Sequence, residues 1–142
     1  MKILTIFLFA FISSFTSIAQ NKLTPQLLSS FEWTNSSYDN CTRYYRFRTD
    51  GYFEHWNCSM EELDTGRFEI IMDTLKVYEY RFKSEVPVHL GGEEGTEVRF
   101  QYNYIFRNNA LCNTYYKDYR YGTEKYEQDL KRQYKKKEIV KN

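Results

Sequence analysis

The sequence carries almost no net charge, and this excludes one broad class of function. It has 20 Lys and Arg residues and 19 Asp and Glu residues. Lys2 lies in an N-terminal segment that we expect to be removed, so the exported chain balances at 19 − 19 = 0. A protein dedicated to nucleic acid or to an anionic membrane surface needs a basic field. We therefore expect no nucleic-acid partner.

Residues that support catalysis or metal binding are also scarce. His55 and His89 are the only histidines, and the spacing of the three cysteines matches no zinc-binding pattern. The sequence has no glycine-rich phosphate loop, no nucleophile elbow and no His-Glu-x-x-His helix. It therefore predicts a protein that is not an enzyme and that has neither a cofactor nor a metal site.

The N-terminus carries an apolar run that has the features of a signal peptide. Lys2 is followed by an apolar segment from Ile3 to Ile12, which is too short to span a bilayer. Ser17-Ile18-Ala19 then fits the rule for cleavage before Gln20. We interpret residues 1–19 as a signal peptide, in preference to an uncleaved membrane anchor. The mature protein is then periplasmic or secreted, with no transmembrane segment after cleavage.

Proline is rare, with two residues, whereas aromatic residues make up 19% of the chain and most of them are Tyr. Such a composition favours half-buried strands, because the ring packs while the hydroxyl reaches water or a partner. A short helical or irregular segment is expected at residues 22–30, and an eighth strand could lie within Glu85 to Leu90. Turn residues separate seven predicted strands, at residues 31–38, 42–49, 52–60, 66–72, 74–83, 96–107 and 110–118.

Tight hairpins determine which side chains share a face. A two-residue turn at Asp50-Gly51 pairs Phe47 with Glu54 and Tyr45 with Trp56. In this register Arg43, Met60, Cys41 and Cys58 lie on the same face as those four residues, and His55 lies on the opposite one. A turn at Met72-Asp73 pairs Ile70 with Leu75, Phe68 with Val77 and Glu69 with Lys76. Residues 97–106 also alternate, with Tyr102 and Tyr104 on the apolar face.

After Gly122 the pattern changes from a strand period to a helical one. Thr123 can cap a helix in which Tyr126, Leu130 and Tyr134 recur every four residues. The lysine run at residues 135–137 would then be a solvated helix end. The sequence thus predicts a mainly β protein, an antiparallel up-and-down barrel or strongly curled meander of seven to eight strands with a C-terminal helix.

Four segments in this order resemble small secreted lipocalin-like proteins of bacteria. They are Leu27–Trp33, Phe47–Tyr52, Thr65–Val77 and Leu111–Tyr116. The resemblance implies an up-and-down β-barrel of the calycin type. We accordingly expect a lipocalin-like barrel domain at residues 20–122, followed by a helix and basic tail at residues 123–142.

Three cysteines in an exported protein imply one disulfide and one remaining thiol. Cys41 and Cys58 lie on the same face of the first hairpin as diagonal neighbours, so we assign the disulfide to them. With a two-residue turn at Asn108-Asn109, Cys112 opposes Ile105 on the outer face. There it would stay free or link two chains.

Two classes of function remain open. In the first, the barrel is a binding module for a small, partly apolar ligand. In the second, it is an envelope or secreted interaction protein, such as an inhibitor, whose barrel is filled and whose outer surface binds a protein partner. A catalytic cluster around Glu54 and His55 ranks below both. The predicted ligand-binding residues are Tyr45, Phe47, Trp56, Tyr102 and Tyr104, with Arg43 and Glu54 near the mouth of the barrel.

Overall fold

The structure is a computed structural model that describes residues 22–36, 40–82 and 94–140. The seven predicted strands are all present as β1 to β7, and the predicted short helix is α1. The possible strand within Glu85 to Leu90 lies outside the described residues. The elements in chain order are α1 (Pro25–Ser29), β1 (Phe31–Ser36), β2 (Thr42–Phe47), β3 (Tyr52–Asn57), β4 (Glu62–Ile71), β5 (Thr74–Phe82), β6 (Glu94–Arg107), β7 (Ala110–Asp118), β8 (Thr123–Tyr126), the 3₁₀ helix η2 (Glu127–Asp129) and β9 (Gln133–Glu138).

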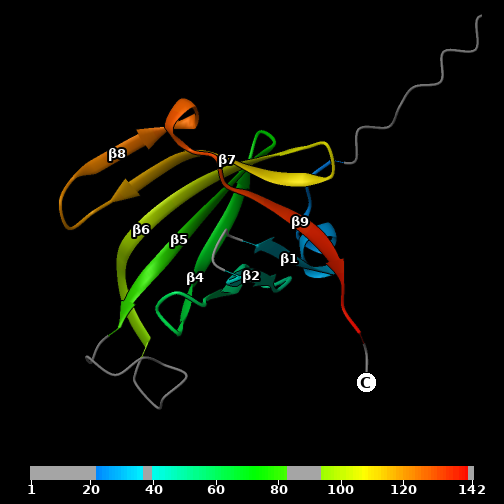
Figure 1. Cartoon of the computed structure of the whole chain (residues 1–142), viewed down its shortest axis with the longest axis horizontal. Coiled ribbons are helices and arrows are strands. Elements are labelled where there is room, and N and C mark those ends of the chain that lie inside the picture. The colour runs from blue at the N-terminus through cyan, green and yellow to red at the C-terminus, as the bar shows by residue number, and fades with distance from the viewer. Residues whose placement is uncertain (1–21, 37–39, 83–93, 141–142) are drawn as a thin grey trace, which may run out of the picture.

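In the described part of the chain, eight antiparallel strands close into a barrel (Figure 1). The strand order is β6-β5-β4-β3-β2-β1-β9-β7, and β6 pairs with β7 to complete the ring. The additional strand β8 pairs only with β7, which carries it outside the ring. The prediction of a mainly β, antiparallel barrel is confirmed. No helix in residues 22–36, 40–82 or 94–140 has the length and apolar character needed to cross a membrane.

The predicted C-terminal helix is wrong, because the end of the chain forms the strand that closes the barrel. β9 pairs with β1 through Trp33 and Lys136 and with β7 through Leu111 and Tyr134. Without β9, β1 and β7 would each leave a row of backbone groups unpaired. The Tyr134 side chain is 1% exposed inside the barrel. Residues 133–138 therefore belong to the barrel rather than to a separate tail.

The first hairpin differs from the predicted register by one residue. Its loop has three residues, Thr49 to Gly51, closed by a hydrogen bond from the Arg48 amide to the Tyr52 carbonyl. Gly51 has φ = +87°, as the bulge residue of this loop type requires. The extra loop residue exchanges the two faces of β3, because side chains alternate along a strand. Tyr45 therefore opposes His55 and Phe47 opposes Phe53, while Tyr44 opposes Trp56 and Arg46 opposes Glu54.

The other two predicted turns have the expected register. Met72 and Asp73 both have positive φ, as do Asn108 and Asn109, which is the backbone of a two-residue type I′ turn. The observed pairs are Ile70 with Leu75, Phe68 with Val77, Glu69 with Lys76 and Ile105 with Cys112. Both hairpins are confirmed.

One end of the barrel is plugged and filled. Thr24 caps α1 by accepting a hydrogen bond from the Leu27 amide. The helix brings Leu28 into the core, where its carbonyl accepts a hydrogen bond of 2.9 Å from the Trp33 indole. Large apolar side chains fill the barrel interior around this contact. They include Phe47, Phe53, Phe68, Leu75, Val77 and Leu111.

The disulfide between Cys41 and Cys58 is confirmed, with 5.6 Å between the two Cα atoms. It joins the residue before β2 to the residue after β3, at the end of the barrel opposite α1. We call this end the mouth; it is formed by the ends of β1, β3, β5 and β7 and the starts of β2, β4, β6 and β9. Cys112 is a free thiol and is buried.

Candidate functional site

Polar side chains from three neighbouring strands meet inside the barrel near its mouth. His55 on β3 lies directly opposite Asp64 on β4, and Glu79 on β5 lies opposite Gly66, two residues further along β4. The alternation of side chains along each strand turns all three inward. Each residue is 3% exposed. We call His55, Asp64 and Glu79 the inner triad.

The side chains of the inner triad are in contact. The Nδ1 atom of His55 lies 3.1 Å from a carboxyl oxygen of Glu79 and 4.0 Å from one of Asp64. The other ring nitrogen, Nε2, lies 3.2 Å from the hydroxyl of Tyr134, which reaches across from β9. The imidazole therefore has partners on both sides and is fixed in orientation.

Burial determines the protonation of the inner triad. Together with the smaller effect of the negative charge of Glu79, it raises the pKa of Asp64 to about 8. It also raises the pKa of Glu79 to about 7, against the smaller effects of a hydrogen bond from Asp64 and of the charge of Arg99. The same burial lowers the pKa of His55 to about 4. At neutral pH His55 is therefore uncharged, and the two carboxyl groups share a proton.

Tyrosine side chains surround the inner triad on the side of the core. The Tyr45 hydroxyl is 3.2 Å from the Tyr104 hydroxyl, and the rings of Tyr45 and Tyr134 are 4.8 Å apart. Burial raises the pKa of each of these phenols, so they stay protonated. They act as neutral hydrogen-bonding groups that separate the triad from the apolar core.

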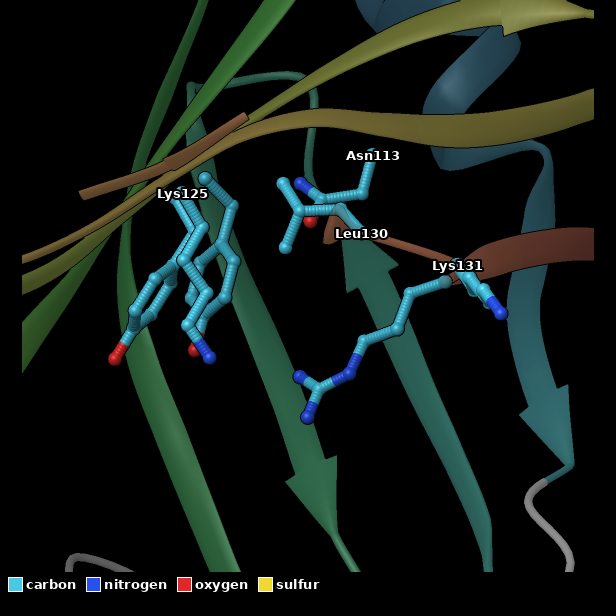
Figure 2. A pocket seen from close by; sticks show the side chains of 7 residues that line it. Asn113, Lys125, Leu130 and Lys131 are labelled. Atoms are coloured by element: carbon cyan, nitrogen blue, oxygen red, sulfur yellow. The ribbon is translucent and has the colours of Figure 1, made fainter. Parts of the chain in front are cut away.

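A pocket of about 280 Å³ opens at the mouth, between β7, β8 and the segment that leads into β9. Figure 2 shows Asn113 and Leu130 between Lys125 and Lys131. Two rings from β6 and β7 supply the wall nearest the core. The lining residues are Tyr102, Asn113, Tyr116, Lys125, Leu130, Lys131 and Arg132.

The lining of this mouth pocket has three cations and no carboxylate. Within the described residues, the guanidinium of Arg132 is in no ion pair, and the buried Oδ1 atom of Asn113 accepts no hydrogen bond. The amide group of Asn113 is held in place by two hydrogen bonds that its Nδ2 donates, to the carbonyls of Asn103 and Tyr115 at 3.0 Å. The pocket is therefore positively charged, with a preoriented polar wall.

The structure distributes the predicted ligand-binding residues over four environments. Tyr102 lines the mouth pocket, whereas Tyr45, Phe47 and Tyr104 are packed in the core below it. Trp56 and Glu54 lie on the outer face of β3, as a consequence of the three-residue loop.

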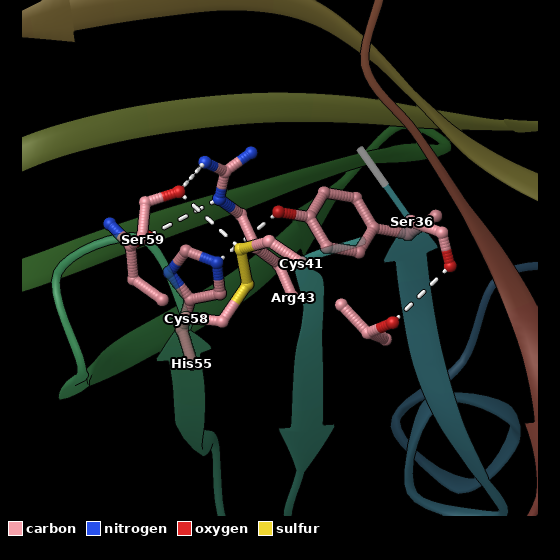
Figure 3. Close-up of a disulfide and its surroundings, with 9 residues drawn as sticks. Ser36, Cys41, Arg43, His55, Cys58 and Ser59 are labelled. Carbon is pink, nitrogen blue, oxygen red and sulfur yellow. Dashed lines mark hydrogen bonds between the residues drawn. A yellow bond between two sulfur atoms is a disulfide. The ribbon is translucent and has the colours of Figure 1, made fainter. Parts of the chain in front are cut away.

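Arg43 lies at the mouth, next to the disulfide (Figure 3). Its guanidinium donates to the Asn57 side chain at 3.3 Å and to the Ser59 hydroxyl at 2.6 Å. Glu54, which was expected near the mouth together with Arg43, instead lies opposite Arg46 in the register of β2 and β3, on the outer face.

The inner triad itself was missed by sequence reasoning, although part of its signal was present. The confirmed pairing of Phe68 with Val77 continues to Gly66 and Glu79. The same alternation along β4 turns Asp64 inward with Gly66 and Phe68. Two acidic residues at core positions of adjacent strands would thus have indicated a buried polar site.

Comparison with known proteins adds no relative. The chain matches no protein family, no curated protein and no solved structure at a significant level. The resemblance to lipocalin-like proteins therefore stays a prediction, while the closed barrel and its disulfide are observed. A β-barrel of this kind is compatible with a binding module.

Proposed function

We propose that this protein is an exported, lipocalin-like binding module that holds a small, partly apolar anion in the mouth pocket. The observation that carries the proposal is the composition of the pocket lining. Lys125, Lys131 and Arg132 supply positive charge, while Tyr102 and Tyr116 supply apolar ring surface. A ligand with an acidic group on a flat apolar body matches both.

The charge of the pocket supports an anionic ligand. Lys125, Lys131 and Arg132 are exposed, so their charges attract an approaching anion and can form charge-assisted hydrogen bonds with it. The free Oδ1 atom of Asn113 can accept a hydrogen bond from a hydroxyl or amide of the same ligand. A single ligand can thus use both polar sides of the pocket.

The size of the pocket supports a small ligand. Pockets for small molecules range from about 300 to 1,000 Å³, and the volume of about 280 Å³ lies just below this range. The packed rings of Tyr45, Phe47 and Tyr104 leave the deeper part of the barrel filled. The ligand then occupies the mouth rather than the barrel axis, and its apolar body is of the size of one or two fused rings.

Export is part of the same proposal. The N-terminal residues have the pattern of a signal peptide, with the cleavage motif before Gln20. The disulfide between Cys41 and Cys58 suits an oxidising compartment, since cytosolic proteins rarely keep one. A periplasmic or secreted location accounts for both features.

Titration calorimetry with two matched probes tests the proposal. We expect 2-naphthoate to bind at least tenfold more tightly than the neutral 2-naphthamide, because only the acid can pair with Arg132. The affinity for 2-naphthoate should fall as salt is added, since the cations are partly exposed. In Arg132→Gln the preference for the acid should decrease about tenfold.

Lys22→Gln is the matched control, because it removes an exposed charge that is remote from the pocket in sequence and is not part of its lining. It should bind both probes as the unmodified protein does. Equal affinity for acid and amide, no binding of either, or an equal effect of the two substitutions would contradict the proposal.

A further inference from the structure

The three side chains of the inner triad present one imidazole nitrogen and two carboxylate oxygens to a common point. These ligand atoms all lie within 4.8 Å of one another, with separations of 3.1 Å and 4.0 Å from His55 Nδ1 to Glu79 and Asp64. Metal bonds of about 2.1 Å place neighbouring ligand atoms of a tetrahedral ion about 3.4 Å apart. Small side-chain movements are enough to bring all three atoms onto one ion.

The scaffold holds these groups as a metal site requires. Each ligand comes from an inward-facing position of a different strand, and His55 and Asp64 are direct neighbours across β3 and β4. The Nε2 atom of His55 lies against the Tyr134 hydroxyl at 3.2 Å. A metal-binding histidine generally donates its second N–H to such an oxygen, which fixes the tautomer and the ring plane.

The charges of the inner triad also match a divalent cation. Within the described residues neither Asp64 nor Glu79 forms an ion pair with a Lys or Arg side chain, although both are 3% exposed. Without an ion the two buried carboxyl groups avoid the cost of two negative charges by sharing a proton, and a divalent cation can take the place of that proton. One divalent ion bound to both carboxylates and to neutral His55 gives a site with no net charge.

We propose that His55, Asp64 and Glu79 bind one divalent transition-metal ion, with Zn²⁺ as the best match. Imidazole and carboxylate together suit Zn²⁺, which commonly takes three protein ligands and a water molecule. The site is distinct from the mouth pocket, since the two share no residue. The proposal therefore goes beyond anion binding and does not depend on it.

Titration of the purified protein with Zn²⁺ alone, in a buffer that does not chelate metals, tests this site. We expect one ion per chain and a higher melting temperature in its presence, because the ion binds only the folded state. Co²⁺ should replace Zn²⁺ and give visible absorption bands of a site with nitrogen and oxygen ligands. The near-isosteric variants Glu79→Gln and Asp64→Asn should each weaken Zn²⁺ binding at least tenfold.

Two controls make the test decisive. Circular dichroism of Glu79→Gln and Asp64→Asn reports whether each still folds, and affinities are compared for folded variants. His89→Gln removes the second histidine of the chain, which lies outside the described residues, and should leave binding unchanged. Absence of Zn²⁺ binding, full affinity in both carboxylate variants, or loss of binding in His89→Gln would overturn the proposal.

Discussion

Tyr45 and His55 stack across β2 and β3, with ring centroids 4.2 Å apart and an angle of 15° between the ring planes. They are direct partners in the register of the first hairpin. The stack covers one face of the imidazole, while Tyr134 and Glu79 contact its two nitrogens. The tyrosine thus separates the inner triad from the apolar core.

Replacing Tyr45 tests this packing. Tyr45→Phe keeps the ring and removes the hydrogen bond to Tyr104, so we expect a loss of about 1 kcal/mol in the free energy of unfolding. Tyr45→Ala removes the ring as well and should cost about 3–5 kcal/mol. Urea unfolding measures both. Tyr121→Phe, at a residue that is 77% exposed, should change nothing, and equal stability of the two Tyr45 variants would contradict the stack.

Shortening the C-terminus tests the closure of the barrel. A chain that ends at Leu130 lacks β9 and the buried Tyr134 ring. In it, β1 and β7 lose the hydrogen bonds that they make with β9. We expect it to lose more than about 4 kcal/mol or to fail to unfold cooperatively in thermal melts. A chain that ends at Glu138 keeps all of β9 and should melt like the full protein. A native melt of the shorter chain would show that β9 is dispensable.

Removing the disulfide tests its contribution to stability. The double change Cys41→Ser and Cys58→Ser opens a link between residues 17 positions apart, which should cost about 3 kcal/mol. A reducing agent should lower the melting temperature of the unmodified protein to the same extent. Cys112→Ala is the control, and its melting temperature should respond to the reducing agent just as that of the unmodified protein does. A double variant as stable as the oxidised protein would contradict this expectation.

Replacing Gly66 tests the close approach of β4 and β5 beside the inner triad. A Cβ atom at this position would lie 1.9 Å from the Tyr78 carbonyl oxygen and 2.9 Å from the Phe53 ring. The strands would have to move apart, so Gly66→Ala should cost about 1–3 kcal/mol in urea unfolding. Thr65→Ala changes the next residue on the outer face and should cost less. An unchanged midpoint for Gly66→Ala would mean that the strands yield easily.

Local turn chemistry made most of the fold predictable. Met72-Asp73 and Asn108-Asn109 form two-residue turns, so the alternation of apolar residues extends from them into the correct pairs. An Asp-Gly pair is also typical of two-residue turns, but here Asp50 and Gly51 are the last two residues of a three-residue loop. Whether the hairpin forms a two-residue turn or a three-residue loop depends on how both strands pack in the barrel, and the local sequence does not show this.

The C-terminal strand could not be predicted because the strands that it pairs with, β1 and β7, come earlier in the sequence. Tyr126, Leu130 and Tyr134 are spaced like a helical stripe, but only Tyr134 is buried in the core. What selects a strand at residues 133–138 is the pair of open edges on β1 and β7. A pattern within one segment carries no information about edges formed by others.

The candidate site was predictable only in part, for the same reasons. Tyr102 was placed correctly on the inner face by the alternation in β6 and it lines the mouth pocket. His55 was assigned to the outer face because of the one-residue error in its hairpin. Lys125 reaches the pocket from β8, and Lys131 and Arg132 reach it from the segment that leads into β9; both stretches were expected to be helical.

The edge of β7 is divided between two partners, with Ala110–Cys112 paired to β9 and Tyr115–Asp118 paired to β8. The pairs that close the ring and the pairs that hold β8 outside it therefore occupy separate stretches of β7. The segment from Tyr119 to Lys131 can be lengthened, shortened or randomised while the closing pairs stay in place. A library confined to that segment would vary Lys125, Leu130 and Lys131 of the pocket lining, while Tyr102, Asn113 and Tyr116 stay fixed on the barrel strands.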